Sequence, residues 1–194
     1  MISGIILASG FSRRMEEEKL LLPVGGVSLV EHVIRAAQAS HLNEVILIYR
    51  NKSIKEIGQR YIMRMVCNDH ADEGQSAAIK LGISAAHQET DAFMFMVGDQ
   101  PFLNPLVINT LIAIFKENPR HIIVPVYNGK RGNPVIFPSQ FKNDLLTLSG
   151  DGGGRIIIEK SRNSVKLVEI GDSSVGCDID TQEEYEKIEK NRLG

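Results

Sequence analysis

The sequence predicts an α/β fold, with a mostly parallel central sheet and helices on both of its faces. Two observations lead to this prediction. Segments typical of strands and segments typical of helices alternate from one end of the chain to the other. Ala92–Val97 (AFMFMV) is apolar at every position, which is typical of a strand at the centre of a parallel sheet, because such a strand is covered on both faces.

The first half of the chain begins with the apolar run Ile2–Ala8, which predicts a strand. Ser28 and Glu31 have the spacing of a capping box, and apolar residues at helical spacing follow, so we expect a helix to begin there. The same kinds of signal predict helices at Ile54–Tyr61 and Gln75–His87, and strands at Glu44–Tyr49, Ile62–Cys67 and Ala92–Val97.

The second half continues the alternation. Gly129–Pro134 has the composition of a turn. Thr181 and Glu184 form a second capping-box pattern, which predicts the start of a last helix. In this half of the chain, helices are expected near Pro105–Lys116 and at Arg155–Lys160, and strands at Ile122–Val126, Val135–Phe137 and Val165–Ile170.

The bulk composition is that of a soluble globular protein. Of 194 residues, 43% are hydrophobic and 24% are charged, and the length suits one domain over residues 1–194. The formal net charge of -2 gives no electrostatic reason to expect nucleic acid as a partner. Cys67 and Cys177 lack the spacing of a zinc site or a disulfide framework, which favours a cytoplasmic setting. Neither a signal-peptide pattern nor an apolar run of ~20 residues occurs, so no membrane partner is expected.

The loop after the first predicted strand has small residues and then cations. Ala8–Gly10 leaves room for a ligand to approach the main-chain N–H groups, and Ser12 offers a hydroxyl. Arg14 and Lys19 can bind phosphate oxygens. The loop lacks the Walker and dinucleotide-binding patterns, so a solvated loop with surface cations is the alternative. The acidic run at 16–18 is expected to be solvated.

Two later segments offer acids for a metal ion. Asp99 follows the strand Ala92–Val97, and a carboxylate there would face the ligand crevice and suit Mg²⁺. Asp178 and Asp180 point to the same side if their segment is extended, so either could be a second ligand. The alternatives are an aspartate in a turn for Asp99 and helix capping for Asp180.

Glycine-rich segments offer sites for the rest of the substrates. Gly74-Gln75-Ser76 opens a predicted helix, and its N–H groups, amide and hydroxyl could bind a base edge or a phosphate. The segments at 131–134 and 150–155 carry polar side chains that could bind a second substrate. The alternatives are an N-cap for the first segment and ordinary turns for the other two.

Together these segments resemble the MobA-like nucleotidyltransferases, in particular the molybdenum cofactor cytidylyltransferases. The family signature L-A-A-G-x-S-x-R-M-G-x-x-K is matched by Leu7, Ala8, Gly10, Ser12, Arg14, Met15 and Lys19. Ser9 replaces the second alanine, and Glu16 replaces a glycine. The later matches, in the family's order, are LP (22–23), GQS (74–76), GDQP (98–101), GNPV (132–135), GDGGGR (150–155) and DIDTQEEY (178–185).

The resemblance implies a Rossmann-like three-layer sandwich of the nucleotide-diphospho-sugar transferase type. It implies transfer of CMP from CTP to molybdopterin (molybdenum cofactor) with release of pyrophosphate, and Mg²⁺ as the cofactor. A molybdenum hydroxylase is the protein partner that this activity suggests. The alternatives are another nucleotide, a sugar-phosphate acceptor, or a non-catalytic accessory protein that binds the molybdenum cofactor.

The resemblance also assigns residues by their position in the motifs. It implies that the catalytic residues are Lys19, Arg14 and Asp99, and that the Mg²⁺ ligands are Asp99 and Asp180. The nucleotide would be bound by Leu7, Ala8, Ser9, Gly10, Ser12, Arg14, Lys19, Gln75, Ser76 and Asp99. The acceptor would be bound by Gly132, Asn133, Pro134, Asp151 and Arg155.

The choice of base depends on Ser9. In the family, alanine at this position goes with cytidine and glycine goes with guanine. Ser9 is closer in size to alanine and would crowd a purine, which favours CTP, while its hydroxyl leaves ATP and GTP open. No Ser/His/Asp set or reactive cysteine is apparent in the sequence, so we expect direct in-line attack of an acceptor phosphate oxygen on the α-phosphorus. The expectation requires Lys19, Asp99 and Asp180 to lie on the same edge of the sheet.

Overall fold

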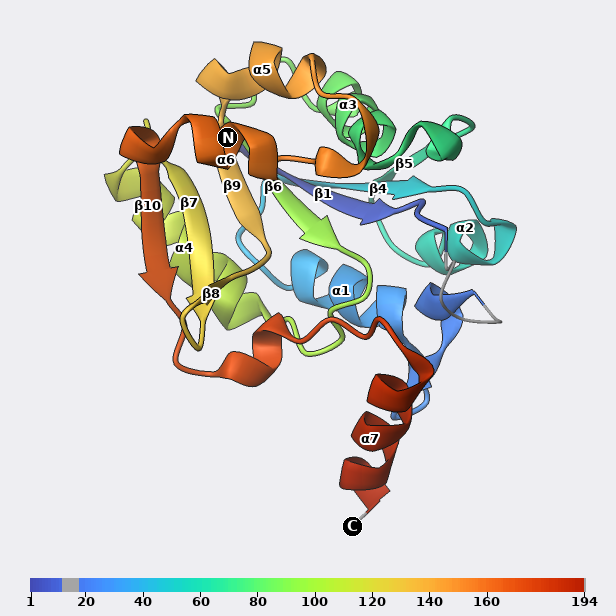
Figure 1. Ribbon diagram of the computed structural model, residues 1–194. Coiled ribbons are helices and arrows are strands. Elements are labelled where there is room, and N and C mark those ends of the chain that lie inside the picture. The colour runs from blue at the N-terminus through green and yellow to red at the C-terminus, as the bar shows by residue number, and fades with distance from the viewer. Residues whose placement is uncertain (12–17, 194) are drawn as a thin grey trace.

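The computed structural model describes residues 1–11 and 18–193, and it places a central sheet between two layers of helices (Figure 1). One face of the sheet is covered by α1 (Leu29–Gln38), α2 (Lys52–Gly58) and α4 (Pro105–Glu117). The other face is covered by α3 (Gln75–Ala85), α5 (Lys142–Leu146) and α6 (Arg155–Lys160). The predicted α/β class and Rossmann-like sandwich are therefore confirmed.

The main sheet has the strand order β10-β7-β9-β6-β1-β4-β5, and β8 pairs with β7 beside this path. In chain order the strands are β1 (Ile2–Ala8), β4 (Glu44–Tyr49), β5 (Arg64–Cys67), β6 (Ala92–Val97), β7 (Ile122–Tyr127), β8 (Lys130–Arg131), β9 (Val135–Pro138) and β10 (Val165–Glu169). The pairs from β6 through β1 and β4 to β5 are all parallel, so their carboxyl ends meet at one edge. β9 is antiparallel to both of its neighbours, β6 and β7.

Two apolar cores explain why the central strands show little polar alternation. Along β1, Ile2 and Ile6 pack into the core beneath α1 and α4, whereas Ile5 packs into the core beneath α3 and α5. Successive side chains of a strand point to opposite faces, so a strand between two helix layers must be apolar on both sides. This packing holds the strand ends, and the loops that follow them, in place.

The predicted elements are present, and several of their boundaries are shifted. β5 begins at Arg64 rather than Ile62, whose side chain is exposed, and α3 ends at Ala85 rather than His87. α2 begins earlier than predicted because Asn51 accepts a hydrogen bond from the Ser53 N–H at 2.7 Å and caps it. The sequence analysis did not predict α5 or the hairpin of β2 (Pro23–Val24) and β3 (Val27–Ser28).

Of the two predicted capping boxes, one is confirmed and one is wrong. The Glu184 N–H donates to Thr181 Oγ1 at 3.3 Å, and the Thr181 N–H donates to Glu184 Oε2 at 3.0 Å. Ser28 does precede α1, but its hydroxyl has no hydrogen-bond partner among the described residues. Glu31, the other half of that predicted box, instead binds Arg35 and Tyr61.

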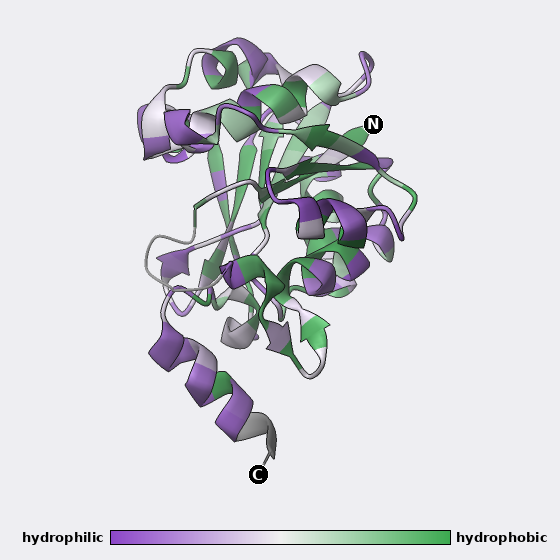
Figure 2. Cartoon of the chain, turned by 90° about the vertical axis from the view of Figure 1, so that its right-hand side faces the viewer, coloured by the Kyte–Doolittle hydropathy of each residue, from purple (hydrophilic) through white to green (hydrophobic). Residues whose placement is uncertain are grey.

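The C-terminal helix α7 (Gln182–Leu193) extends away from the body of the molecule (Figure 1) and is mostly hydrophilic (Figure 2). It is attached through Tyr185, whose hydroxyl donates to the carbonyl of Pro23 in β2 at 2.7 Å. Tyr185 also packs against a small core of Val24, Leu29 and Ile179. Across the described ranges, no helix combines the length and apolar character needed to cross a membrane.

Candidate active site

The parallel edge of the sheet opens onto a cavity of about 300 Å³ beyond β1 and β6. This is the edge at which α/β sheets bind ligands, because the loops after the strands diverge there. Of the residues proposed from the sequence, its wall contains Leu7, Ser9, Gly10, Lys19, Gln75, Asp99 and Asp151. We call it the first cavity.

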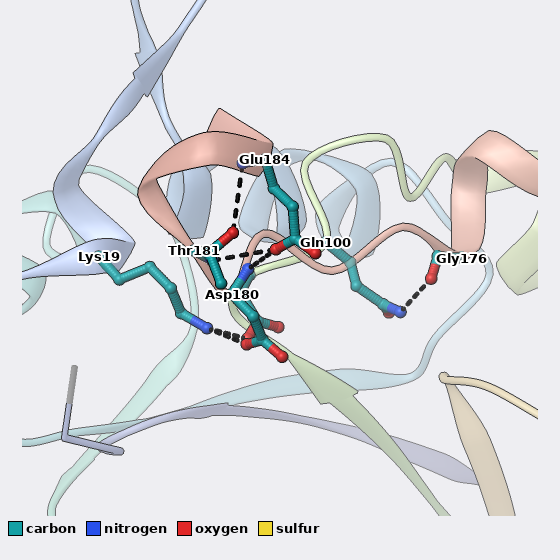
Figure 3. Close-up of polar contacts among 7 residues, drawn as sticks. Lys19, Gln100, Gly176, Asp180, Thr181 and Glu184 are labelled. Carbon is teal, nitrogen blue, oxygen red and sulfur yellow. Dashed lines mark hydrogen bonds and ion pairs between the residues drawn. The ribbon is translucent and has the colours of Figure 1, made fainter. Parts of the chain in front are cut away.

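Lys19 lies between two acids that are far apart in the sequence. Its Nζ donates to Asp99 Oδ2 at 2.6 Å and to Asp180 Oδ1 at 2.9 Å. The 3₁₀ turn Lys19–Leu21 carries the lysine, Asp99 follows β6, and Asp180 precedes α7. Figure 3 shows the lysine reaching toward Asp180. The three residues therefore lie on the same edge of the sheet, as the sequence analysis required.

Backbone hydrogen bonds hold Asp180 in this position. The Ile179 N–H donates to the carbonyl of Asp99 at 3.2 Å, which ties the two acid-bearing segments together. Glu184 Oε2 accepts from the N–H of Asp180 at 2.8 Å, in addition to that of Thr181 (Figure 3). The carboxylate of Asp180 is therefore presented by the start of α7 and is not used as its cap.

The ion pairs keep Lys19 charged. Burial of the ammonium alone would lower its pKa, but the carboxylates of Asp99 and Asp180 outweigh this effect and raise the pKa above its ordinary value of 10.5. The side chain of Lys19 is 15% exposed and that of Asp99 is 19% exposed, so this charge is only partly screened by water. A cation in this position can bind phosphate oxygens that enter the first cavity.

Asp178 lies beside this cluster and is affected by it. Burial of its carboxyl, followed by the negative charge of Asp99, raises the pKa of Asp178 to about 6. The charge of Asp180 adds to the rise, while a hydrogen bond from Gln100 opposes it. Among the described residues it is Asp180, rather than Asp178, that contacts Lys19.

Ser9 is buried at the end of β1, with 4% of its surface exposed. Its Oγ accepts a hydrogen bond from Asn68 Nδ2 at 2.8 Å, and Asn68 Oδ1 accepts from the His70 N–H at 3.1 Å. The second bond determines which way the Asn68 amide points, so the amide donates to Ser9. The hydroxyl proton of Ser9 thus remains available to the first cavity, and this bond joins the loops after β1 and β5.

Two glycine motifs that are far apart in sequence pack against each other at the start of α3. The N–H of Gln75 donates to Asp151 Oδ1 at 3.3 Å. A Cβ on Gly74 would lie 2.6 Å from that same oxygen, and a Cβ on Gly153 would collide with the Gln75 side chain. Asp151, assigned to the acceptor by resemblance, therefore lines the first cavity.

A second and larger cavity, of about 680 Å³, adjoins the first. The two cavities share Leu7, Gln75 and Val97 in their walls. Of the residues assigned to the acceptor, the second cavity contains Gly132, Asn133 and Arg155. Its wall includes the apolar side chains of Phe95, Val124, Phe137 and Ile158, the cations Lys130 and Arg131, and the acid Glu159, which pairs with Arg155.

The other predicted residues fall into two groups. Ser12 and Arg14 lie outside the described residues. Within the described part of the chain, the walls of the two cavities do not include Ala8, Ser76 or Pro134. Ser76 is buried at the start of α3, and its hydroxyl donates to the Glu73 carbonyl at 3.5 Å. Pro134 follows Asn133 in the loop before β9.

Arg50, at the end of β4, contacts the wall of the first cavity and was not predicted from the sequence. Arg50 Cζ lies 4.4 Å from the centroid of the Phe11 ring, and Phe11 lines the first cavity. Arg50 Nη2 also binds Glu18 Oε2 at 3.0 Å. Glu18 is therefore not a purely solvated charge, which corrects the expectation for that part of the acidic run. No pattern in the sequence connects Arg50 to the first loop; the pairing of β4 with β1 does so.

Asp99, in the wall of the first cavity, and Asp180, which shares Lys19 with it, fit a hard divalent cation. Asp99 Oδ1 is buried and has no hydrogen-bond partner among the described residues, so a ligand oxygen is available there. Within the same residues no group of three or more His, Cys, Asp or Glu side chains is close enough to hold a metal ion. Mg²⁺ commonly takes only one or two protein carboxylates and obtains its remaining oxygens from water and substrate phosphates. Asp99 and Asp180 meet that requirement.

The fold, with a lysine and two acids gathered at its ligand edge, suits the handling of a nucleoside triphosphate. Comparison with known proteins places this chain among the nucleotidyltransferases. It belongs to the family of the MobA-like NTP transferase domain, which matches residues 4–165. The matched range includes Lys19 and Asp99 and ends before Asp180.

Several relatives match nearly the whole chain. The purine catabolism protein PucB of Bacillus subtilis is 30% identical over 96% of this chain and 95% of its own. The nicotine blue oxidoreductase of Paenarthrobacter nicotinovorans is 25% identical over 96% of each chain. A probable molybdenum cofactor guanylyltransferase of Bacillus cereus is 26% identical over 97% of this chain and 96% of its own. The names of these relatives differ, so the family membership does not define the substrates.

Solved structures agree with the fold. A nucleotidyl transferase from Methanothermobacter superposes with a TM-score of 0.83 and 24% identity over all of this chain and 98% of its own. The Mycobacterium tuberculosis protein Rv0371C, crystallised with manganese, superposes with a TM-score of 0.81 and 21% identity over 97% of this chain and 98% of its own.

Proposed function

We propose that this protein transfers CMP from CTP to molybdopterin and releases pyrophosphate. The observation that carries the proposal is the position of Lys19, held between Asp99 and Asp180 beside two adjoining cavities. A transferase needs both of its substrates bound next to each other. The first cavity has the polar groups that suit a triphosphate, and the second has room for an acceptor.

In this proposal an oxygen of the acceptor's terminal phosphate attacks the α-phosphorus of the nucleotide. A new P–O bond forms as the bond to the β-phosphate oxygen breaks, and pyrophosphate leaves. Such a reaction depends on positioning and charge neutralisation more than on a strong base. Lys19 would bind the phosphate oxygens and stabilise the charge that the leaving group gains. Arg14 would assist from the first loop.

We further propose that Asp99 and Asp180 hold Mg²⁺. When bound, the ion would neutralise charge on the phosphate oxygens. The buried and unpartnered Asp99 Oδ1 supports this assignment. The manganese complex of Rv0371C, a protein with the same fold, supports a divalent cation in general.

CTP is the nucleotide we favour, because the side chain of Ser9 is closer in size to alanine than to glycine and would crowd a purine. Its hydroxyl is held by Asn68, so it does not turn out of the way. GTP is the second candidate, since relatives along most of the chain are named molybdenum cofactor guanylyltransferases. ATP is a third possibility by the same chemistry.

Molybdopterin is the acceptor we favour. The apolar side chains and the cations Lys130 and Arg131 in the wall of the second cavity suit a fused ring that carries a phosphate. The same chemistry would accept another small phosphate, such as a sugar phosphate. The names of PucB and nicotine blue oxidoreductase suggest a partner enzyme of the molybdenum hydroxylase type. The remaining alternative is a carrier that binds the molybdenum cofactor without catalysis. Such a carrier releases no pyrophosphate, so it has less need of a cation such as Lys19 to stabilise a leaving group.

Pyrophosphate release tests the proposal. The purified protein is incubated with CTP, GTP or ATP, with and without molybdopterin, in Mg²⁺ or in EDTA. We expect release with CTP only when molybdopterin and Mg²⁺ are both present. A panel of sugar phosphates replaces molybdopterin in parallel reactions.

Each other outcome has a defined meaning. Release with GTP and not CTP would keep the reaction and change the nucleotide. Release only with a sugar phosphate would change the acceptor. Binding of molybdopterin without release under any condition would favour the carrier and contradict the proposed activity.

A further inference from the structure

Tyr127 connects the loop at 130–134 with the segment at 176–180, although it belongs to neither. It is the last residue of β7, and 7% of its surface is exposed. The residue is absent from the walls of both cavities as the structure describes them, so we do not expect it to touch a substrate. It lies between the loop that borders the second cavity and the segment that carries Asp180.

The ring of Tyr127 packs against two glycines that are 44 positions apart. A Cβ on Gly132 would lie 2.7 Å from Tyr127 Cδ2, and a Cβ on Gly176 would collide with the same edge of the ring. Neither glycine has a positive φ, so close approach of the ring explains them better than backbone conformation does. Gly132 borders the second cavity, and Gly176 lies four residues before Asp180.

The hydroxyl of Tyr127 makes a directed contact with the acceptor loop. It donates to the carbonyl of Asn133 at 2.8 Å. Burial, followed by the charge of Asp178, raises the pKa of Tyr127, so the hydroxyl stays protonated and remains a donor. Asn133 is in the wall of the second cavity and Tyr127 is not, so a residue outside the cavity fixes the position of a residue in its wall.

The segment at 176–180, on the other side of the Tyr127 ring, is fixed by its own hydrogen bonds. The side chain of Gln100, next to Asp99, is buried and donates to the carbonyl of Gly176 at 3.5 Å (Figure 3). The Ile179 N–H donates to the carbonyl of Asp99. The Tyr127 ring therefore rests on a segment whose position relative to Asp99 is already defined.

We propose that Tyr127 is a positioning residue that sets the acceptor loop, residues 130–134, against the acid-bearing segment, residues 176–180. The inference rests on the proposed function, because it assigns the loop to the acceptor. Its distinctive consequence is selectivity. Loss of the hydroxyl should weaken acceptor use and leave nucleotide use unchanged, since the hydroxyl donates to Asn133 in the wall of the second cavity, whereas the ring that packs against Gly176 remains.

The kinetic test uses Tyr127→Phe, which keeps the ring and removes the hydroxyl. We expect the KM for molybdopterin to rise roughly 3- to 10-fold, the range that loss of one neutral hydrogen bond gives. The kcat and the KM for CTP should stay within about twofold of the wild type. Tyr61→Phe is the matched control, because it removes a hydroxyl that donates to buried Glu31 at 2.7 Å. It should leave all three parameters unchanged.

Tyr127→Leu tests the ring itself. Without the ring both glycine segments lose their support, so we expect a higher KM for molybdopterin together with a lower kcat. Tyr127→Phe with an acceptor KM within twofold of the wild type would overturn the proposal. An equal rise in the KM for CTP and for molybdopterin would overturn it as well, because that pattern indicates a general structural role.

Amide hydrogen exchange provides a readout that does not depend on turnover. The Gly132 N–H donates to the Pro125 carbonyl at 3.0 Å, and its protection reports on the acceptor loop. In Tyr127→Phe we expect faster exchange in residues 130–134 and unchanged exchange in β1 and β6. If the wild type turns over no acceptor, the proposed function fails and exchange alone decides this inference. Equal loop exchange in Tyr127→Phe and Tyr61→Phe would then reject it.

Discussion

At the residue scale, the site depends on how its charges are balanced. Burial, followed by the charges of Asp99 and Asp180, raises the pKa of Asp178, and Lys19 contacts both Asp99 and Asp180. Like charges that share a site repel, and a buried carboxylate needs a partner to stay ionised. Lys19 supplies this partner in the protein without ligands. A divalent cation bound by Asp99 and Asp180 would add positive charge to that of Lys19 and neutralise these carboxylates further.

Asp99→Asn tests this arrangement, because it keeps the shape of the side chain and removes its charge. We expect the rate of pyrophosphate release to fall on the order of 10² or more, since one of the two proposed metal carboxylates and the main partner of Lys19 are lost. The thermal midpoint should change little, because the substitution also relieves repulsion by Asp178.

Asp91→Asn is the matched control, since Asp91 lies just before the other end of the same strand and its side chain is 72% exposed. It should turn over like the wild type. A rate for Asp99→Asn close to that of this control would remove Asp99 from the catalytic site.

The sequence identified Lys19, Asp99 and Asp180 because each belongs to a short motif with recognisable chemistry. It could not identify Arg50 or Tyr127, whose partners are brought to them by the pairing of β4 with β1 and by the turn between β7 and β8. It also assigned Asp151 to the acceptor, whereas the residue lines the first cavity. Contacts between segments far apart in sequence decide these positions, and no local pattern records them.

At the element scale, a buried carboxylate joins α1 to the end of α2. The side chain of Glu31 is 8% exposed, and its Oε1 accepts from Arg35 at 2.8 Å and from the Tyr61 hydroxyl at 2.7 Å. Its Oε2 accepts from Arg60 at 3.1 Å. This network explains why the capping box predicted for Glu31 does not form: the guanidinium groups of Arg35 on α1 and Arg60 after α2 offer stronger hydrogen bonds than one backbone N–H.

Glu31→Gln should lower the free energy of unfolding by about 1–3 kcal/mol at pH 7, because it weakens charge-assisted hydrogen bonds at a buried position. Burial alone would raise the pKa of Glu31, but Tyr61 and Arg35 outweigh it and hold the pKa below its ordinary value of 4.5. The stabilisation is therefore complete above about pH 4.5 and is lost as the pH falls through the depressed pKa.

Urea unfolding at a series of pH values measures this effect. The gap between the wild type and Glu31→Gln should be constant from pH 7 to pH 5 and narrow below that. A gap that persists unchanged at pH 3 would show that packing, and not the charge of Glu31, is responsible.

The elements that the sequence predicted well are the long apolar strands and the helices with strong periodicity. β1, β6 and α6 have the predicted bounds. The elements it missed are short. The two-residue strands β2 and β3 depend on packing beneath α7, and α5 depends on the core beneath α3. Short elements carry too few residues to show a period, so their existence is decided by tertiary packing.

At the scale of the whole molecule, the turn at Gly74–Gln75 packs closely against the distant segment at 150–153, and this packing positions the two cavities relative to each other. Gly74, before α3, has φ +89° and ψ -171°, a conformation that is essentially restricted to glycine. Its Cα also approaches the segment Gly150–Asp151 so closely that a methyl group would meet Asp151 Oδ1 at 2.6 Å. The turn that lines the first cavity and the loop that leads into the second are thereby joined.

Gly74→Ala should strain the backbone and separate these two segments at once. We expect the free energy of unfolding to fall by about 1–3 kcal/mol from the backbone alone, and the KM values for both substrates to rise, because Gln75 and Asp151 line the first cavity and Gln75 is shared with the second. Gly171→Ala is the matched control, since Gly171 has neither a positive φ nor any atom within 4 Å of the added methyl group. Denaturation curves and initial rates of both variants decide the matter. If Gly74→Ala is as stable and as active as Gly171→Ala, the two motifs do not need this contact, and the cavities are positioned by the sheet alone.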